Sequence, residues 1–253
     1  MQWLCILAAS FAAGAVNAIA GGGTLLSFPT LIWLGRDPIV ANATNAVALW
    51  PGSLAAMLGF RRELVAAHRR ALWLTAPSIL GGALGAALLL HTPSKVFGAL
   101  VPYLILFATG LFAAQRPINR ALGPRTLHGA SGHSWLLAAG FQLLVATYGG
   151  YFGAGMGIVM LAALALLGLA DIHEANALKN LFAVCVNGIA AALFVAGGAI
   201  DWPDATLMAA GAIVGGFFGA ALGRRLGRAF VHRVVVAVGL AAALSMLLLL
   251  RRG

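Results

Sequence analysis

Long apolar segments recur from one end of this chain to the other, and very few charged residues interrupt them. We count ten, covering roughly residues 3–20, 23–35, 39–60, 71–91, 96–114, 134–152, 155–170, 175–199, 205–223 and 232–250. A soluble domain carries about 25% charged residues, whereas this chain has 9% and is 62% hydrophobic. A helix needs about 20 apolar residues to cross a bilayer. We therefore predict an all-α, polytopic integral membrane protein with about eight to ten transmembrane helices.

Two of these segments are too short to cross a bilayer, and each lies beside a cluster of glycines. The first cluster is Gly21, Gly22 and Gly23, and the second is Gly149, Gly150, Gly153, Gly155 and Gly157. Glycine at this density destabilises a helix. In hydrocarbon, the freed backbone groups must be buried in protein or line a cavity. The sequence therefore predicts helices that are broken at the two glycine clusters.

The two halves of the chain carry the same landmarks about 135 positions apart. Asn45 corresponds to Asn180 and Gly22 to Gly157. Gly81-Gly82-x-x-Gly85 corresponds in the same way to Gly215-Gly216-x-x-Gly219. We therefore divide the chain into a first transmembrane repeat (1–114), a connecting loop (115–133) and a second transmembrane repeat (134–253).

Basic residues gather in three of the connections between apolar segments. The clusters are Arg61, Arg62, Arg69 and Arg70; Arg116, Arg120 and Arg125; and Arg224, Arg225, Arg228 and Arg233. If all ten segments cross, these connections share one side, which the positive-inside rule makes cytoplasmic. The opposite side then holds both termini, Arg36, and the acidic pair Asp201 and Asp204. The net charge of +10 is thus a signal of topology, and we expect no nucleic acid partner.

This topology makes the two repeats inverted relative to each other, an arrangement typical of transporters. The alternative joins each short segment to a neighbour and leaves about eight crossings in two parallel halves. It would place the cluster from Arg224 to Arg233 on the side opposite the other two clusters. We favour the inverted arrangement.

Glycines also recur at four-residue spacing in two later segments. Gly211, Gly215, Gly219 and Gly223 fall on one face of the segment 205–223, and Gly81 and Gly85 do the same in the segment 71–91. Small residues at this spacing let membrane helices approach closely. We therefore predict that these glycines mark tight helix packing.

Polar side chains lie near the two glycine clusters, at corresponding places in the two halves. They are Asn17, Thr24, Ser27, Asn42, Thr44 and Asn45, and then Gln142, Thr147, Tyr148, Asn176, Lys179, Asn180 and Asn187. Paired helix breaks mark the substrate site in many transporters. Amides, hydroxyls and one amine, with no carboxylate, suit an anion. The alternative is that the glycines only allow close packing and that the polar groups bond across helices.

Other chemistry finds little support in the sequence. His173-Glu174 begins a zinc motif, but Ala177 stands where the second histidine would be. Gly129-x-Ser131-Gly132 resembles a protease nucleophile, but no histidine lies in mid-span to act as its base. Cys5 and Cys185 lie in separate apolar spans, where we expect small core residues. We therefore predict no catalytic residue, metal or cofactor.

Two stretches of the sequence resemble one known family. They are Gly14-x-x-Asn17-x-x-Ala20-Gly21-Gly22-Gly23-Thr24-x-x-x-x-Pro29 followed by Ala41-Asn42-Ala43-Thr44-Asn45, and Gly149-x-x-x-Gly153-x-Gly155-x-Gly157 followed by Ala177-x-Lys179-Asn180. Both are similar to the sulfite exporter TauE/SafE family, and the resemblance covers nearly the whole chain. It implies a multi-pass permease of a prokaryotic plasma (inner) membrane that exports sulfite or another small, sulfur-containing anion. Met156 interrupts the second glycine run where the first is continuous.

The resemblance and the polar pattern together give an expected binding site. Its residues are Asn17, Gly21, Gly22, Gly23, Thr24, Asn45, Gly155, Gly157, Lys179 and Asn180. We expect Asn45 and Asn180 to orient a small anion and Lys179 to supply charge, unless Lys179 reaches out to water or pairs with Asp171 or Glu174. The expected partners are the anion and membrane lipid. The sequence is also compatible with a homo-oligomer. The alternatives are a permease for another small metabolite or ion, or an intramembrane enzyme.

Overall fold

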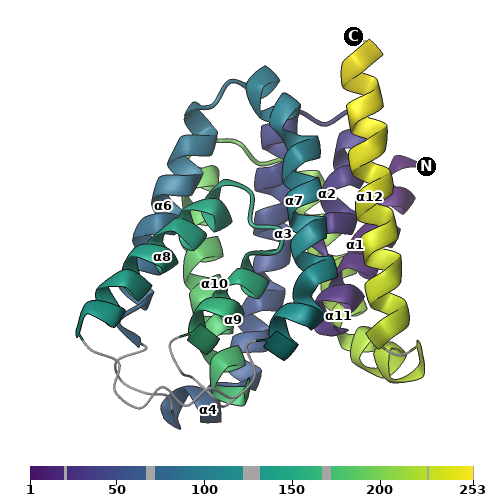
Figure 1. Ribbon diagram of the computed structural model, residues 1–253. Coiled ribbons are helices and arrows are strands. Elements are labelled where there is room, and N and C mark those ends of the chain that lie inside the picture. The colour runs from purple at the N-terminus through teal and green to yellow at the C-terminus, as the bar shows by residue number, and fades with distance from the viewer. Residues whose placement is uncertain (20–21, 67–71, 122–131, 167–171, 227, 253) are drawn as a thin grey trace.

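The computed structural model describes residues 1–19, 22–66, 72–121, 132–166, 172–226 and 228–252, which form a bundle of helices (Figure 1). The helices are α1 (Gln2–Ile19), α2 (Thr24–Trp33), α3 (Pro38–Gly59), α4 (Arg61–Ala66), α6 (Thr75–His91), α7 (Ser94–Ala121), α8 (Gly132–Tyr151), α9 (Met156–Leu166), α10 (Ile172–Ala196), α11 (Trp202–Leu226) and α12 (Arg228–Arg252). Each of the ten apolar segments corresponds to one of these helices. The prediction of an all-α fold is confirmed.

Two details differ from the sequence prediction. The short helix α4 follows α3 directly and was not expected, because six polar and apolar residues show no clear period. The loop assigned to residues 115–133 is partly helical, since α7 continues to Ala121 and α8 begins at Gly132. The division into two repeats is not affected by these extensions and stays a prediction.

Three of the described helices are long and apolar enough to cross a bilayer. The qualifying stretches are Ser94–Ala114 in α7, Glu174–Ala196 in α10 and Phe230–Leu248 in α12. Shorter apolar helices are Gln2–Asn17, Thr24–Trp33, Thr75–His91 and Leu136–Tyr151. Large apolar side chains also face outward, as in Leu84 at 57% exposure, Leu137 at 76% and Phe217 at 79%. Contact between such an apolar surface and lipid has no free-energy cost, whereas contact with water is unfavourable.

The described parts of the three basic clusters share one end of the bundle. In Figure 1, α4, the end of α7 and the start of α12 all lie at the lower end, and these helices carry residues of the three clusters. The turn between α6 and α7 lies at the upper end, and both chain termini lie toward it. This is the distribution that the ten-crossing topology predicted, whereas the parallel alternative would separate α12 from α4. Which end faces the cytoplasm stays a prediction.

Two glycine-lined interfaces hold the bundle together. Helix α1 packs closely on α11, where a Cβ atom at Gly14 would overlap the carbonyl oxygen of Ala212. Helix α6 packs in the same way on α8, where a Cβ atom at Gly81 would lie 2.6 Å from the Cβ atom of Ala146. Gly85, Gly211 and Gly215 are equally confined by the facing helix. Tight packing at these glycines is confirmed. Gly219 and Gly223, which were also expected at the interface, lie outside the part of α11 whose side chains are described.

The two interfaces exchange helices between the halves of the chain. The offset seen in the sequence makes α1 correspond to α8 and α6 correspond to α11. Each close pair, α1 with α11 and α6 with α8, therefore joins one half to the other. Related halves would produce this exchange, which supports the repeat; the repeat and its orientation stay predictions.

Candidate functional site

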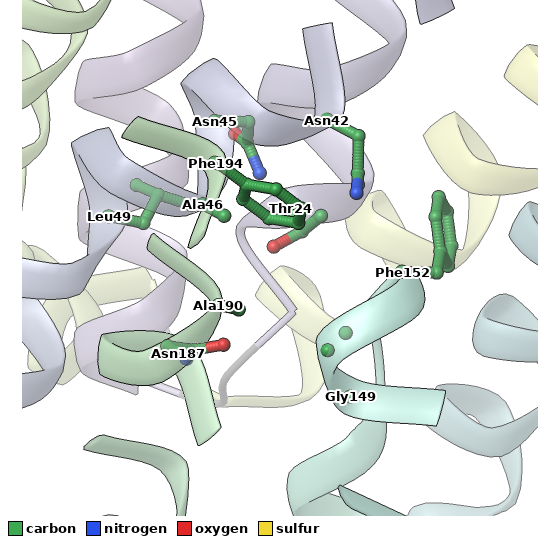
Figure 2. A pocket seen from close by; sticks show the side chains of 12 residues that line it. Thr24, Asn42, Asn45, Ala46, Leu49, Gly149, Phe152, Asn187, Ala190 and Phe194 are labelled. Atoms are coloured by element: carbon green, nitrogen blue, oxygen red, sulfur yellow. The ribbon is translucent and has the colours of Figure 1, made fainter. Parts of the chain in front are cut away.

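A cavity of about 50 Å³ lies among α2, α3, α8 and α10 (Figure 2). Its polar lining comes from both halves of the chain and consists of Thr24, Asn42, Asn45 and Asn187. Phe152 and Phe194 supply apolar walls, and Gly149, Gly150 and Gly153 expose backbone along one side. Among the described residues that line this cavity there is no carboxylate, ammonium or guanidinium. It is a neutral, hydrogen-bonding site in an apolar bundle.

The first glycine cluster places Thr24 at the cavity. Gly22 has a φ of 91°, a left-handed conformation that glycine adopts without strain. The side-chain Oδ1 of Asn17 accepts a hydrogen bond from the backbone N of Gly23 at 2.7 Å. The chain therefore reverses direction between α1 and α2, and α2 begins with Thr24 beside the cavity.

The second glycine cluster forms the opposite wall. Gly153 and Gly155 have φ values of 80° and 79°, so the chain leaves helical conformation between α8 and α9. The hydroxyl of Tyr148 donates to the carbonyl of Ala154 at 2.6 Å and holds this turn closed. A side chain at Gly149 or Gly150 would meet Met156 or the backbone of Gly82. These glycines let α8, α6 and α9 approach one another around the cavity.

Two asparagines on α3 are held in defined orientations. Asn45 is 2% exposed, and its Oδ1 accepts a hydrogen bond from the Oγ of Ser27 on α2. Asn42 is 3% exposed, and its Nδ2 donates to the carbonyl of Tyr151 at 3.1 Å. Figure 2 shows the amide nitrogen of Asn45 directed toward the space beside Thr24. That Nδ2 has no hydrogen-bond acceptor among the described residues, so it is available to a ligand.

Of the ten expected site residues, the structure brings Thr24 and Asn45 to the cavity. Gly22 and Gly23 shape the turn, packing against Phe112 and Ala13, and Asn17 caps that turn. Gly155 does not line the cavity; a Cβ atom added there would lie 3.5 Å from the Cα atom of Ala108 on α7. Gly21 lies outside the described residues.

Lys179 and Asn180 are on α10 but do not line the cavity. Lys179 extends along α9, where its Cδ would lie 3.4 Å from a Cβ atom at Gly157. It forms no ion pair with any residue that the structure describes, Glu174 included; Asp171 lies outside that part. Asn180 is seven residues before Asn187, about 10 Å along the helix.

Asn42 and Asn187 take the places expected for Asn180 and Lys179. The sequence showed both among the polar residues near the glycine clusters but did not assign them to the site. Asn42 precedes Asn45 by three residues and shares its helix face, and Asn187 follows Asn180 by seven on the same face of α10. Helical spacing was therefore the signal that could have found them.

No group of three or more histidine, cysteine or acidic side chains that could hold a metal is present among the described residues. The enzyme motifs noted above are not informative in the structure. Ser131 lies outside the described residues, and the side chain of His173 does as well.

An ion pair joins the two halves close to the cavity. Arg36, between α2 and α3, donates to both carboxylate oxygens of Asp204 at 2.6 and 3.2 Å and lies 3.9 Å from Asp201. The hydrogen bond with Asp204 raises the pKa of Arg36 above its ordinary value. The backbone N of Asp201 also donates to the Thr44 hydroxyl at 3.0 Å, next to Asn45. Arg36 and this acidic pair were expected on one side of the membrane, and the structure brings them into contact.

Comparison with protein-family models matches residues 6–246 to the family described as Sulfite exporter TauE/SafE. The chain belongs to this family. Among TauE/SafE-like relatives, a probable membrane transporter protein of Haemophilus influenzae is 35% identical over 232 residues, covering 89% of this chain and 87% of the relative. The probable membrane transporter protein YfcA of Escherichia coli K12 is 29% identical, covering 89% and 82%. No solved structure matches this chain.

A third relative, the probable membrane transporter protein ORF9 of Sinorhizobium, is 26% identical, with 96% of this chain and 91% of the relative covered. The relatives therefore match over most of their own length. Together with the apolar helices, they identify this TauE/SafE protein as a membrane transporter, as the sequence resemblance implied.

Proposed function

We propose that this transporter is a permease for a small anion, such as sulfite or a sulfur-containing organic anion, and that the neutral cavity is its binding site. The observation that carries the proposal is the Nδ2 of the buried residue Asn45, which lies at the cavity without an acceptor among the described residues. Ser27 occupies the other end of the same amide. A hydrogen-bond donor that is held in place suits an oxyanion.

The cavity lining favours an anion over a cation. Transferring an ion out of water is costly unless the protein provides hydrogen bonds or opposite charge. Asn45, Thr24 and Asn187 can donate hydrogen bonds, whereas no carboxylate lines the cavity to balance a cation. The start of α2, at Thr24, adds the partial positive charge of a helix N-terminus.

Lys179 and Asn180 are the second contact point in this proposal. They lie nearer the start of α10 than Asn187 does, beside the beginning of α9 at Gly157. An anion that enters from the basic end along α10 would meet the ammonium of Lys179 before it reached the cavity. Lys179 thus serves the permeation path rather than the cavity itself.

We propose export across the inner membrane of a prokaryote as the direction. The relatives are bacterial, and the positive-inside rule makes the basic end of the bundle cytoplasmic. A cell interior that is 100 mV negative favours outward movement of an anion by about 2.3 kcal/mol per charge. Export of this kind needs no enzymatic step and no ATP.

The proposal is tested by the flux of radiolabelled sulfite in proteoliposomes that contain the purified protein. The flux with the wild-type protein should exceed the flux in protein-free liposomes. Asn45→Ala should lower the flux at least about tenfold, because hydrogen bonds to charged groups contribute roughly 1.5–3 kcal/mol. Thr206→Ala, on an exposed position of α11, is the control and should leave the flux unchanged. Equal fluxes for Asn45→Ala and wild type would remove the cavity from the pathway.

A second candidate is a permease for a small uncharged metabolite, because the cavity has no charged lining residue. Under that function, an imposed membrane potential would not alter the flux. A flux that responds to membrane potential favours the anion.

A further inference from the structure

The two amides of α3 that line the cavity have opposite groups engaged in hydrogen bonds. Asn45 uses its Oδ1 to accept from Ser27, which leaves the Nδ2 as a donor. Asn42 uses its Nδ2 to donate to Tyr151, which leaves the Oδ1 as an acceptor. Neither remaining atom has a hydrogen-bond partner within the described part of the chain. One turn of one helix, at the cavity lining, therefore carries one donor and one acceptor that remain for a ligand.

The other polar groups of the cavity are less constrained. The hydroxyl of Thr24 and the amide of Asn187 make no hydrogen bond to another described residue, so each can turn to donate or accept. Ser27, by contrast, is 1% exposed, so water does not reach its hydroxyl to replace the hydrogen bond with Asn45. The fixed pattern that a ligand meets is thus set by Asn42 and Asn45.

The absence of lining charge limits the ligand's own charge. The cost of moving an ion out of water rises with the square of its charge, so a dianion costs about four times as much as a monoanion of the same size. Amide and hydroxyl donors offset part of this cost for a single charge. No ammonium or guanidinium among the lining residues offsets the remainder for a second charge.

We propose that the cavity selects a singly charged oxyanion that also carries a hydrogen-bond donor, such as a monoprotonated oxyanion or a hydroxylated sulfonate. The charged oxygens accept from Asn45 Nδ2, and the ligand's O–H donates to Asn42 Oδ1. This inference rests on the proposed function, since it specifies the class of anion that the same cavity binds. The Tyr151 carbonyl acts as a positioning group, because it can only accept and so fixes the amide of Asn42, while the hydroxyl of Ser27 contacts the Oδ1 of Asn45.

A matched pair of organic anions tests the inference. 2-Hydroxyethanesulfonate and ethanesulfonate carry the same single charge and differ by one hydroxyl group. In wild-type proteoliposomes, 2-hydroxyethanesulfonate should be transported about tenfold faster at low concentration, because ethanesulfonate leaves the Asn42 acceptor unpaired. The dianion 1,2-ethanedisulfonate should be transported more slowly than either.

Two variants separate the roles of the amides. Asn42→Ala should bring the ratio of the two monoanion fluxes close to one, while the flux of ethanesulfonate persists. Asn45→Ala should lower both fluxes together and preserve their ratio, since it removes the donor for the charged group that they share. The wild-type ratio itself does not depend on either variant folding.

The outcomes distinguish this inference from the proposed function. Wild-type fluxes that are measurable but equal for the two monoanions, or a dianion flux as high as theirs, would overturn the inference and leave an anion permease standing. No flux of any of the three anions or of sulfite above that of protein-free liposomes would overturn both.

Discussion

Arg36 and Asp204 form a two-pronged ion pair between the two halves of the chain. The guanidinium donates two hydrogen bonds to the carboxylate, at 2.6 and 3.2 Å. The side chain of Asp204 is 1% exposed, whereas that of Arg36 is 28% exposed. Removing the arginine would therefore leave a buried carboxylate with no ion-pair partner among the described residues.

We expect Arg36→Ala to lower the free energy of unfolding by about 2–4 kcal/mol, below the cost for a fully buried pair because Arg36 is partly exposed. Arg36→Lys should recover part of the loss, since lysine keeps the charge but not the two-pronged geometry. Thermal unfolding in detergent measures both. Lys95→Ala, an exposed cation in the first turn of α7, is the matched control and should leave the melting temperature unchanged.

The same ion pair predicts that the stability contributed by Arg36 does not change at moderately alkaline pH. Because its folded pKa is raised, Arg36 stabilises the fold below its unfolded pKa, and this stability is lost only as pH rises through the higher folded value. The difference in melting temperature between wild type and Arg36→Ala should therefore stay constant from about pH 7 to pH 10. A difference that shrinks over this range would mean that another group carries the effect.

The close approach of α6 and α8 predicts that Gly85→Ala is destabilising. Its Cβ atom would overlap the carbonyl of Thr147 and lie 2.7 Å from the backbone N of Tyr151. Neither is the end of a flexible side chain, so the helices must separate, at a cost of about 1–3 kcal/mol. Gly110→Ala in α7 has nothing within 4 Å and should be neutral or slightly stabilising, because alanine favours helix. Similar melting temperatures for the two variants would contradict this packing.

The two ends of the bundle predict a labelling pattern for single cysteines. In a variant without Cys5 and Cys185, Lys95→Cys lies at the end away from the basic clusters, and Glu63→Cys lies in α4 at the basic end. A membrane-impermeant maleimide should label the first in intact cells and the second only after permeabilisation. The reverse pattern would invert the assigned orientation.

Lys179 offers a test of the permeation path beyond the cavity. We expect Lys179→Gln to lower sulfite flux about tenfold and Lys179→Arg to retain most of it, because the positive charge and not the amine assists the anion. The preference between the two monoanionic sulfonates should not change in either variant, since Lys179 does not line the cavity. Full activity of Lys179→Gln would contradict a role in permeation and would mean that Lys179 only packs against Gly157.

Patterns that depend on neighbours along one helix could be predicted from the sequence. The apolar segments gave the helices, and four-residue glycine spacing gave the interfaces at Gly85 and Gly215. Charge placed Arg36 on the same side as Asp204, although it could not show that they touch. The turn at Gly22 followed from the low helix propensity of glycine.

The composition of the cavity could not be predicted, because it depends on how α3 and α10 cross. The repeat pairs Asn45 with Asn180, which suggested that the two amides meet. The helices instead run antiparallel: Trp50 of α3 donates to the carbonyl of Val184 at 3.2 Å, while Asn42 shares the cavity with Phe194. Corresponding residues on antiparallel helices lie at different heights, so Asn45 shares the cavity with Asn187, Ala190 and Phe194 and not with Asn180.

The most direct test of the cavity as the anion pathway is chemical blockage at Ala46, which lines it one residue after Asn45. In the cysteine-free variant, Ala46→Cys is treated with N-ethylmaleimide, and Ala192→Cys, on an exposed face of α10, serves as control. Modification should stop the flux of 2-hydroxyethanesulfonate only in Ala46→Cys, and this anion should slow the modification there. Undiminished flux after complete modification of Ala46→Cys would contradict the assignment of the cavity as the binding site.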